Sequence, residues 1–282
     1  MAQHAERFGI GIDIGGTGIK GGIVDLKKGK LVGERFRIPT PQPATPEAVA
    51  AVVAEVVAEL DSREGAPGLG SPVGVTFPSI VVDGVTLSAA NVDKSWIGTN
   101  ADALFTRVLG RPVHLMNDAD AAGLAEARFG AGKDTSGVVL TITLGTGIGS
   151  AMVNDGRLVP NTELGHLEMN GTDAESQASA SARERLGLDW DEYAQRLQQY
   201  FSHVEFLFSP RLFIVGGGIS KRSEDFLPQL SLKTPIIPAK LKNNAGIVGA
   251  ALQAGVQEKA AAKAARHEHA EAPVQRAEPV DA

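Results

Sequence analysis

The sequence contains no cysteine in its 282 residues, so disulfides and thiolate metal sites are excluded. It also lacks an apolar run of about 18 residues, which a membrane-spanning helix would need. The polar start, Met1 to Arg7, has neither the basic beginning nor the apolar stretch of a signal peptide. We therefore expect a cytoplasmic protein with no membrane partner.

Positive charge is not in excess either. The formal net charge is −6, from 27 basic and 33 acidic residues. A general nucleic-acid binder is usually basic, so we expect no nucleic-acid partner. A polyanionic ligand would need a local basic patch.

A hydrophobic strand, a glycine turn and a returning strand occur twice, at residues 8–25 and 137–154. Each unit is followed by mixed helix and strand signals, and hydrophobic residues, at 43%, suffice for a sizeable core. The repetition predicts an α/β protein of two related domains, residues 1–130 and 131–256, with a cleft between them. The last helix is a candidate to return to the first domain. The segment 257–282 has almost no large apolar residues and is predicted to be disordered.

Two of the expected helices have clear limits in the sequence. Thr45 precedes Pro46, and a Thr N-cap with Pro at the first helical position marks a helix start. Apolar residues at helical spacing continue to Leu60. A second long helix is expected from Trp190 to Phe208.

The first glycine turn lies in Asp13-Ile-Gly-Gly-Thr-Gly-Ile-Lys, at the end of a hydrophobic strand. Gly15 and Gly16 let backbone amides approach an anion without intervening side chains. Thr17 adds a hydroxyl donor and Lys20 a charge, and Asp13 can hold Mg²⁺ through water. A plain hairpin turn is the alternative interpretation.

The second glycine turn contains Gly145, Thr146 and Gly147. Its alternating glycines suggest a dinucleotide site, but that motif requires a following helix, and here a strand follows. Two such turns facing one cleft would hold a chain of phosphates from both sides. A third glycine run includes Gly217 and Gly218 and can admit a flat base, or it is simply a strand-to-helix turn.

Asp118 follows the strand His114-Leu-Met and begins a helix. Ligand contacts in α/β folds gather where strands end, and a carboxylate there can accept the proton of an attacking hydroxyl during phosphoryl transfer. An N-cap carboxylate is the alternative for Asp118, and the same alternative applies to Asp120.

A polar cluster surrounds the stretch Glu163-Leu-Gly-His. Glu163, His166 and Glu175, together with Asn91 and Asn117 from the first domain, would suit recognition of the neighbouring hydroxyls of a sugar. A structural histidine or a His–Glu metal site is the alternative. The spacing is not that of the His-Glu-x-x-His zinc motif.

These motifs, in this order over residues 8–255, resemble the ROK family of sugar kinases and repressors. The resemblance implies two ribonuclease-H-like domains of the actin/hexokinase type, and homodimers. Two further stretches, Asn91 to Gly98 and Asn117 to Glu126, look like a narrower branch, the actinobacterial polyphosphate glucokinases. The implied activity is Mg²⁺-dependent transfer of a phosphoryl group from polyphosphate, ATP or both to the 6-hydroxyl of glucose.

The resemblance also implies roles for particular residues. Asp118 would be the catalytic base. The sugar would be bound by Asn91, Asn117, Glu163, His166 and Glu175. The phosphates would be held by Gly15, Gly16, Thr17, Lys20, Gly145, Thr146 and Gly147, with Gly217 and Gly218 beside the nucleotide. Many family members carry a cysteine-rich zinc loop that is missing between His166 and Glu175, so we expect no zinc site.

Three alternatives remain at this point. An ATP-only hexose kinase acting on glucose or mannose would have the same motifs, as would a non-catalytic sugar-binding protein. A sugar-responsive repressor is disfavoured, because about seven residues precede the first strand and a helix-turn-helix needs more. A polyphosphate donor would need a basic track, to which several side chains can contribute: Lys20, Lys27, Lys28, Lys30, Arg35 and Lys94.

Overall fold

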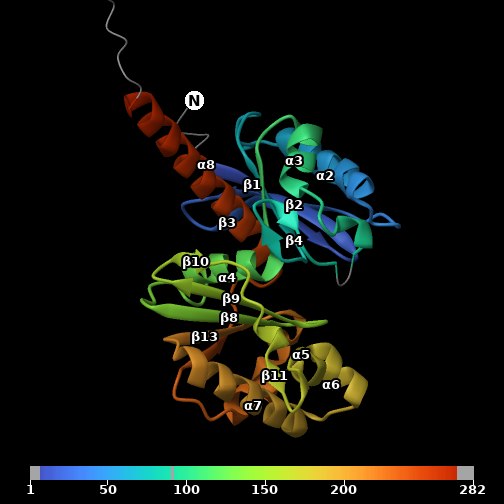
Figure 1. The fold of residues 1–282 in the computed structure, drawn as a ribbon, viewed down its shortest axis with the longest axis vertical. Helices are drawn as coiled ribbons and strands as arrows, with labels where there is room; N and C mark the ends of the chain where they lie inside the picture. Colours follow the sequence, from blue (N-terminus) through green and yellow to red (C-terminus); the bar gives the residue numbers. More distant parts are fainter. Residues whose placement is uncertain (1–6, 90–91, 272–282) are drawn as a thin grey trace, which may run out of the picture.

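The computed structural model describes residues 7–89 and 92–271, and Figure 1 shows two α/β halves placed one above the other. The first half is a five-stranded sheet in the order β3-β2-β1-β4-β7. Its strands are β1 (Phe8–Gly15), β2 (Gly18–Asp25), β3 (Lys30–Ile38), β4 (Val73–Phe77) and β7 (Val113–Asn117). The helices of this half are α2 (Pro46–Asp61), α3 (Ala101–Leu109) and the 3-10 turn η1 (Lys94–Trp96), with a small hairpin of β5 (Val81–Val82) and β6 (Val85–Thr86).

The second half is a five-stranded sheet in the order β10-β9-β8-β13-β14. Its strands are β8 (Val138–Leu144), β9 (Ile148–Asn154), β10 (Arg157–Val159), β13 (Leu212–Gly216) and β14 (Ile236–Pro238). The other elements of this half are β11 (Glu168–Met169), β12 (Thr172–Asp173), α5 (Glu175–Ala178), α6 (Ala180–Leu186), α7 (Trp190–Phe208), η2 (Leu164–His166), η3 (Gly218–Asp225), η4 (Leu227–Gln229) and η5 (Lys242–Asn244).

Both sheets are built in the same way. In each, three antiparallel strands come first and two parallel strands follow: β1 pairs with β2 and β4 as β8 pairs with β9 and β13. Each sheet has its own hydrophobic core, one with α2 and α3 and the other with α7. The predicted fold class, two α/β domains of the ribonuclease-H type, is confirmed.

Alternation along β1 decides what lies on each face of the first sheet. Ile10 and Ile12 are buried in the core that α2 covers. Gly11 faces the other way, and a Cβ there would overlap the backbone carbonyl of Ile247 in α8 (Ala245–Glu271). The last helix therefore packs closely on the first sheet, and Asp13, two residues beyond Gly11, lies on that same face.

Two helices fill the space between the sheets (Figure 1). Helix α4 (Asp118–Phe129) contacts α8 on one side and β8 and β9 on the other. At the helix crossing, a Cβ on Gly249 would overlap the Ala121 carbonyl, so only glycine permits this approach. The two helices hold the sheets so that the carboxyl ends of β1 and β7 and the turn after β8 can contribute to one site.

The chain end differs from the sequence-based expectation in part. Residues 257–271 continue α8, where the sequence predicts disorder. The stretch is rich in alanine, which has the highest helix propensity, and it extends a helix whose earlier turns are packed, so no new nucleus is needed. Residues 272–282 lie outside the described residues. No helix in the described part of the chain has the length and apolarity to cross a bilayer.

Candidate functional site

The first glycine turn joins β1 to β2, with Gly15 paired to Gly18. Its backbone is held from outside: the Thr40 hydroxyl donates to the Gly15 carbonyl, and the Arg37 guanidinium donates to the Thr17 carbonyl at 2.6 Å. Gly16 and Thr17 are exposed at the tip, and nothing lies within 4 Å of the position a Gly16 Cβ would take. This leaves open space beside the turn for a ligand.

Asp13 lies at the end of β1, below that turn. Its Oδ1 accepts a hydrogen bond from the Thr76 hydroxyl at 3.0 Å, and its Oδ2 lies 3.4 Å from the Lys20 ammonium. Mg²⁺ in phosphoryl-transfer sites usually takes one or two carboxylates together with phosphate oxygens and water. A half-buried carboxylate beside an anion-binding turn fits that donor set. No group of three or more His, Asp or Glu side chains suited to a metal occurs among the described residues.

The second glycine turn joins β8 to β9, and two other segments are packed against it. Oε2 of Glu175 accepts from the Ile148 amide at 3.1 Å, and a Cβ on Gly147 would overlap that carboxylate oxygen. Gly217 has φ +83° and approaches the Leu144 carbonyl so closely that a side chain would overlap it. The predicted phosphate turn and the third glycine run, which includes Gly218, are therefore neighbours.

Asn117 and Asp118 mark the junction between β7 and α4. Oδ1 of Asn117 accepts from the amides of Ala119 and Asp120, at 2.8 and 3.0 Å, and its Nδ2 donates to the Ser79 carbonyl. Asn117 is thus the N-cap of α4. Asp118 is the first residue of the helix, and its Oδ1 accepts from the Ala119 amide at 2.8 Å. Because the cap is Asn117, the carboxylate of Asp118 is not needed for that role.

The surroundings of Asp118 raise the pKa of its carboxyl to about 6. Desolvation is the largest cause, and the negative charges of Asp13 and Glu163 add to it. Solvent still reaches the side chain, so the group is crowded by protein and yet open to a reactant. A carboxylate with this pKa is a better proton acceptor than an ordinary aspartate. Asp13 comes from the first half and Glu163 from the second, so the three predicted site residues Asp13, Asp118 and Glu163 lie near one another.

The predicted sugar-binding cluster is gathered beside this point. Burial raises the pKa of Glu163, with a smaller opposing influence from His166. Nδ1 of His166 lies 2.9 Å from Oδ2 of Asp173, a hydrogen bond that raises the pKa of the histidine. Nε2 is therefore the ring nitrogen of His166 that would contact a ligand. Glu175 acts electrostatically on both Glu163 and His166. Asn91 lies outside the described residues.

Two functional candidates were missed by the sequence reasoning. Asp173 belongs to no recognisable motif, and its role is visible only from its hydrogen bond to His166.

Asn161 has φ +56°. Its side chain exchanges two hydrogen bonds with the backbone of Val81, and its backbone amide donates to Oδ2 of Asp120 at 2.8 Å. It thereby connects the two halves. Desolvation raises the pKa of buried Asp120 to about 7.

Comparison with protein families and curated proteins gives consistent matches. The model described as the ROK family matches residues 9–181. The polyphosphate glucokinase of Mycobacterium tuberculosis (strain CDC 1551 / Oshkosh) is 51% identical over 248 residues, which is 88% of this chain and 91% of that protein.

Solved structures with the same fold include two kinases. The inorganic polyphosphate/ATP-glucomannokinase from Arthrobacter sp. strain KM is 72% identical, with a TM-score of 0.84 over 89% of this chain and 99% of that one. A ROK family glucokinase from Streptomyces griseus, in complex with glucose and AMPPNP, is 27% identical, with a TM-score of 0.72 over 86% of this chain and 98% of that one.

Proposed function

The chain belongs to the ROK family, and we propose that it is a glucokinase that transfers a phosphoryl group from inorganic polyphosphate or ATP to the 6-hydroxyl of glucose. The observation that carries the proposal is the placement of Asp118. Asp118 is the first residue of α4. Desolvation raises the pKa of its carboxyl, and so do the negative charges of Asp13 and Glu163, one from each half. The relative and the two solved structures named above are, by name, kinases of glucose or of glucose and mannose.

In the proposed reaction, Asp118 accepts the proton of the glucose 6-hydroxyl as the oxygen attacks the terminal phosphorus of the donor. The new O–P bond forms as the bond from that phosphorus to the bridging oxygen breaks, and the shortened donor leaves with that oxygen. Proton acceptance by a positioned base contributes about a hundredfold or more to rate. Glu163, His166 and Glu175, with Asn91 and Asn117, would fix the sugar hydroxyls so that one oxygen alone meets the base.

The two glycine turns would hold the donor phosphates. Gly15, Gly16 and Thr17 present one exposed backbone tip, and Gly145, Thr146 and Gly147 present the other, with Gly217 and Gly218 beside it. Lys20 adds positive charge near Asp13. A bound Mg²⁺ would neutralise part of the charge on the phosphates, and Asp13 is the residue that would hold it, directly or through water.

Mannose as a second sugar, a homodimer and a cytoplasmic location remain predictions.

The test is a donor assay on the purified protein. Glucose 6-phosphate formation is measured with ATP and with long-chain polyphosphate, each with glucose and with mannose. We expect turnover with glucose and polyphosphate. Turnover with ATP alone would leave an ATP-dependent hexose kinase. Sugar binding without turnover on either donor would leave a non-catalytic member of the family.

A further inference from the structure

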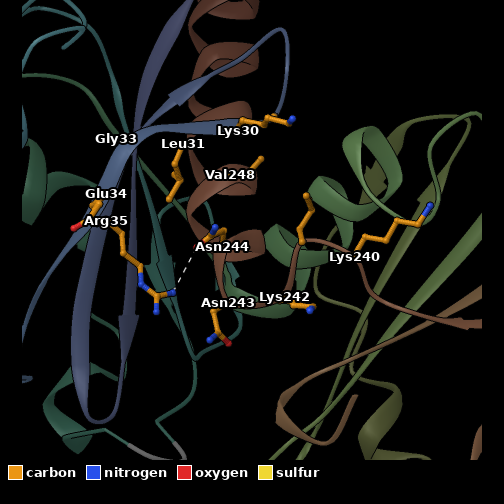
Figure 2. Close-up of a pocket in the computed structure, with 12 residues that line it drawn as sticks. Lys30, Leu31, Gly33, Glu34, Arg35, Lys240, Lys242, Asn243, Asn244 and Val248 are labelled. Carbon is orange, nitrogen blue, oxygen red and sulfur yellow. Dashed lines mark hydrogen bonds between the residues drawn. The ribbon is translucent and has the colours of Figure 1, made fainter. Parts of the chain in front are cut away.

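A cavity of about 720 Å³ lies between β3 and the segment that links β14 to α8 (Figure 2). That volume is in the range of ligand-binding pockets. Four cationic side chains line it, Lys30 and Arg35 from β3 and Lys240 and Lys242 from the linking segment, against the single carboxylate of Glu34. The cavity therefore concentrates positive charge in a protein whose net charge is −6.

No described side chain neutralises these cations by an ion pair. All four are exposed. Arg35 makes one long contact, with its Nη1 3.5 Å from Oδ1 of Asn244, and Figure 2 shows it reaching from β3 toward that residue. Unpaired like charges in one cavity repel one another, and a bound polyanion would relieve that repulsion.

The cavity adjoins the phosphate end of the proposed active site. Arg35 lies two residues before Arg37 on β3, and Arg37 is paired in register with Lys20 of β2. Lys20 lies beside Asp13. On the other side, Asn244 lines the cavity, and a Cβ on Gly246, two residues later, would be 3.4 Å from the Asp13 carboxyl. A row of cations thus runs from the first glycine turn to the cavity.

The lining suits phosphates better than a nucleoside. None of the described residues that line the cavity is aromatic, so no ring is present to stack on a base. The side-chain amides of Asn243 and Asn244 can donate hydrogen bonds to phosphate oxygens, as the ammonium and guanidinium groups can. Of the lysines proposed from the sequence for a basic track, Lys30 lines the cavity, while Lys20, Lys27, Lys28 and Lys94 do not.

We infer that this cavity binds the distal part of a polyphosphate chain whose reacting end lies between the two glycine turns. The inference rests on the proposed function and adds to it a site that ATP and short chains do not occupy. It assigns Lys240, Lys242, Arg35 and Lys30 to donor length selection and not to catalysis.

The test is the double variant Lys240→Gln/Lys242→Asn. Lys242 has φ +52°, and Asn tolerates that left-handed conformation well, so the charge is removed without added strain. With glucose saturating, KM for long-chain polyphosphate should rise about tenfold, as expected for two exposed charge contacts. KM for ATP and for tripolyphosphate, and kcat for every donor, should stay within about twofold of wild type. The slope of log affinity against log salt should fall by about 2.

Two controls accompany the variant. Lys133→Gln/Lys233→Gln removes two exposed lysines that do not line the cavity and should leave the long-chain KM unchanged. Lys240→Arg keeps the charge and should behave as wild type. A long-chain KM that stays at the wild-type value, or that rises equally with the control pair, overturns the inference.

Binding is measured separately from turnover, by calorimetry with long-chain polyphosphate and no glucose. If the wild type uses ATP but not polyphosphate, the proposed donor is wrong, and the calorimetry still decides the cavity. Weaker binding by the Lys240→Gln/Lys242→Asn variant then supports a polyphosphate site. Equal binding by variant and wild type, or none by either, rejects it.

Discussion

Nδ1 of His166 lies 2.9 Å from Oδ2 of Asp173, across a turn that contains η2, β11 and β12. The hydrogen bond fixes the orientation of the imidazole and favours its protonated form, so the pKa of His166 is raised. The hydrogen bond holds the ring in place, and because both side chains are exposed, the other edge of the ring stays open to a sugar. Asp173 is best described as a positioning residue for His166.

We expect Asp173→Asn to lower the pKa of His166, because the charged hydrogen-bond partner is removed. KM for glucose should rise about threefold to tenfold, the effect of one hydrogen bond, with a smaller change in kcat. NMR titration of the His166 ring and steady-state kinetics measure the two effects. Glu168→Gln removes a nearby exposed charge that is paired in register with Asp173 and is the matched control. An unchanged titration of the ring would contradict this role.

Asp118→Asn should lower kcat by about a hundredfold or more, the scale of general-base catalysis, with a smaller change in glucose affinity. Because the pKa of Asp118 is about 6, the wild-type rate should fall as the pH drops below that value and protonates the base. The variant should lose this acidic limb. It should unfold at no lower temperature than wild type, since the side chain is exposed and a charge that Asp13 and Glu163 repel has been removed. Turnover within tenfold of wild type would show that another group is the base.

Asp120 should make the protein less stable as the pH rises. Its folded pKa, about 7, is above the ordinary value of 3.8, so between those limits the folded state binds a proton that the unfolded state has lost. The free energy of unfolding should then fall with rising pH, by at most about 1.4 kcal/mol per pH unit from this group, and level off above pH 7. Urea unfolding of wild type and Asp120→Asn at pH 5, 6 and 7 measures the difference. Parallel curves would mean that Asp120 is ionised throughout.

Removal of divalent metal should separate structure from activity. After dialysis against a chelator we expect an unchanged unfolding temperature and no turnover, with activity restored by Mg²⁺. The reason is that Asp13 offers a carboxylate for an ion shared with the donor phosphates, while the sequence has no cysteine for structural zinc. Elemental analysis that finds one zinc per chain would refute the second half of this prediction.

Truncation after Val256 should leave activity and stability close to wild type. Ala254 is the last fully buried residue of α8 among those whose burial is described, and Val256 to Ala260 are exposed. Chain without a packed face contributes little to the free energy of folding. Circular dichroism should still show a loss of helix, because α8 continues beyond this point. A lower unfolding temperature would place a contact of the removed segment in the folded core.

The sequence by itself determined the local elements and the broad fold. The helix expected from Trp190 to Phe208 has those limits in the structure, and the helix expected to end at Leu60 ends at Asp61. Both depend on caps and apolar spacing, which are properties of neighbouring residues. The two glycine turns were predicted for the same reason, and their repetition was enough to indicate two related domains. The prediction of disorder was wrong for residues 257–271, which continue α8. The segment has few large apolar residues, but its alanines have a high helix propensity.

Only the tertiary structure decided which distant residues meet. Arg35 and Lys242 are 207 positions apart in the sequence, and they share a cavity because α8 returns to the first sheet. That return depends on Gly11 in β1 and Gly74 in β4, which let the backbone of α8 lie directly against the strands. Asn161 and Val81, which are also far apart in the sequence, meet across the boundary between the halves through two hydrogen bonds. Such contacts carry no periodic or local signal, since they are set by the packing of whole elements against one another.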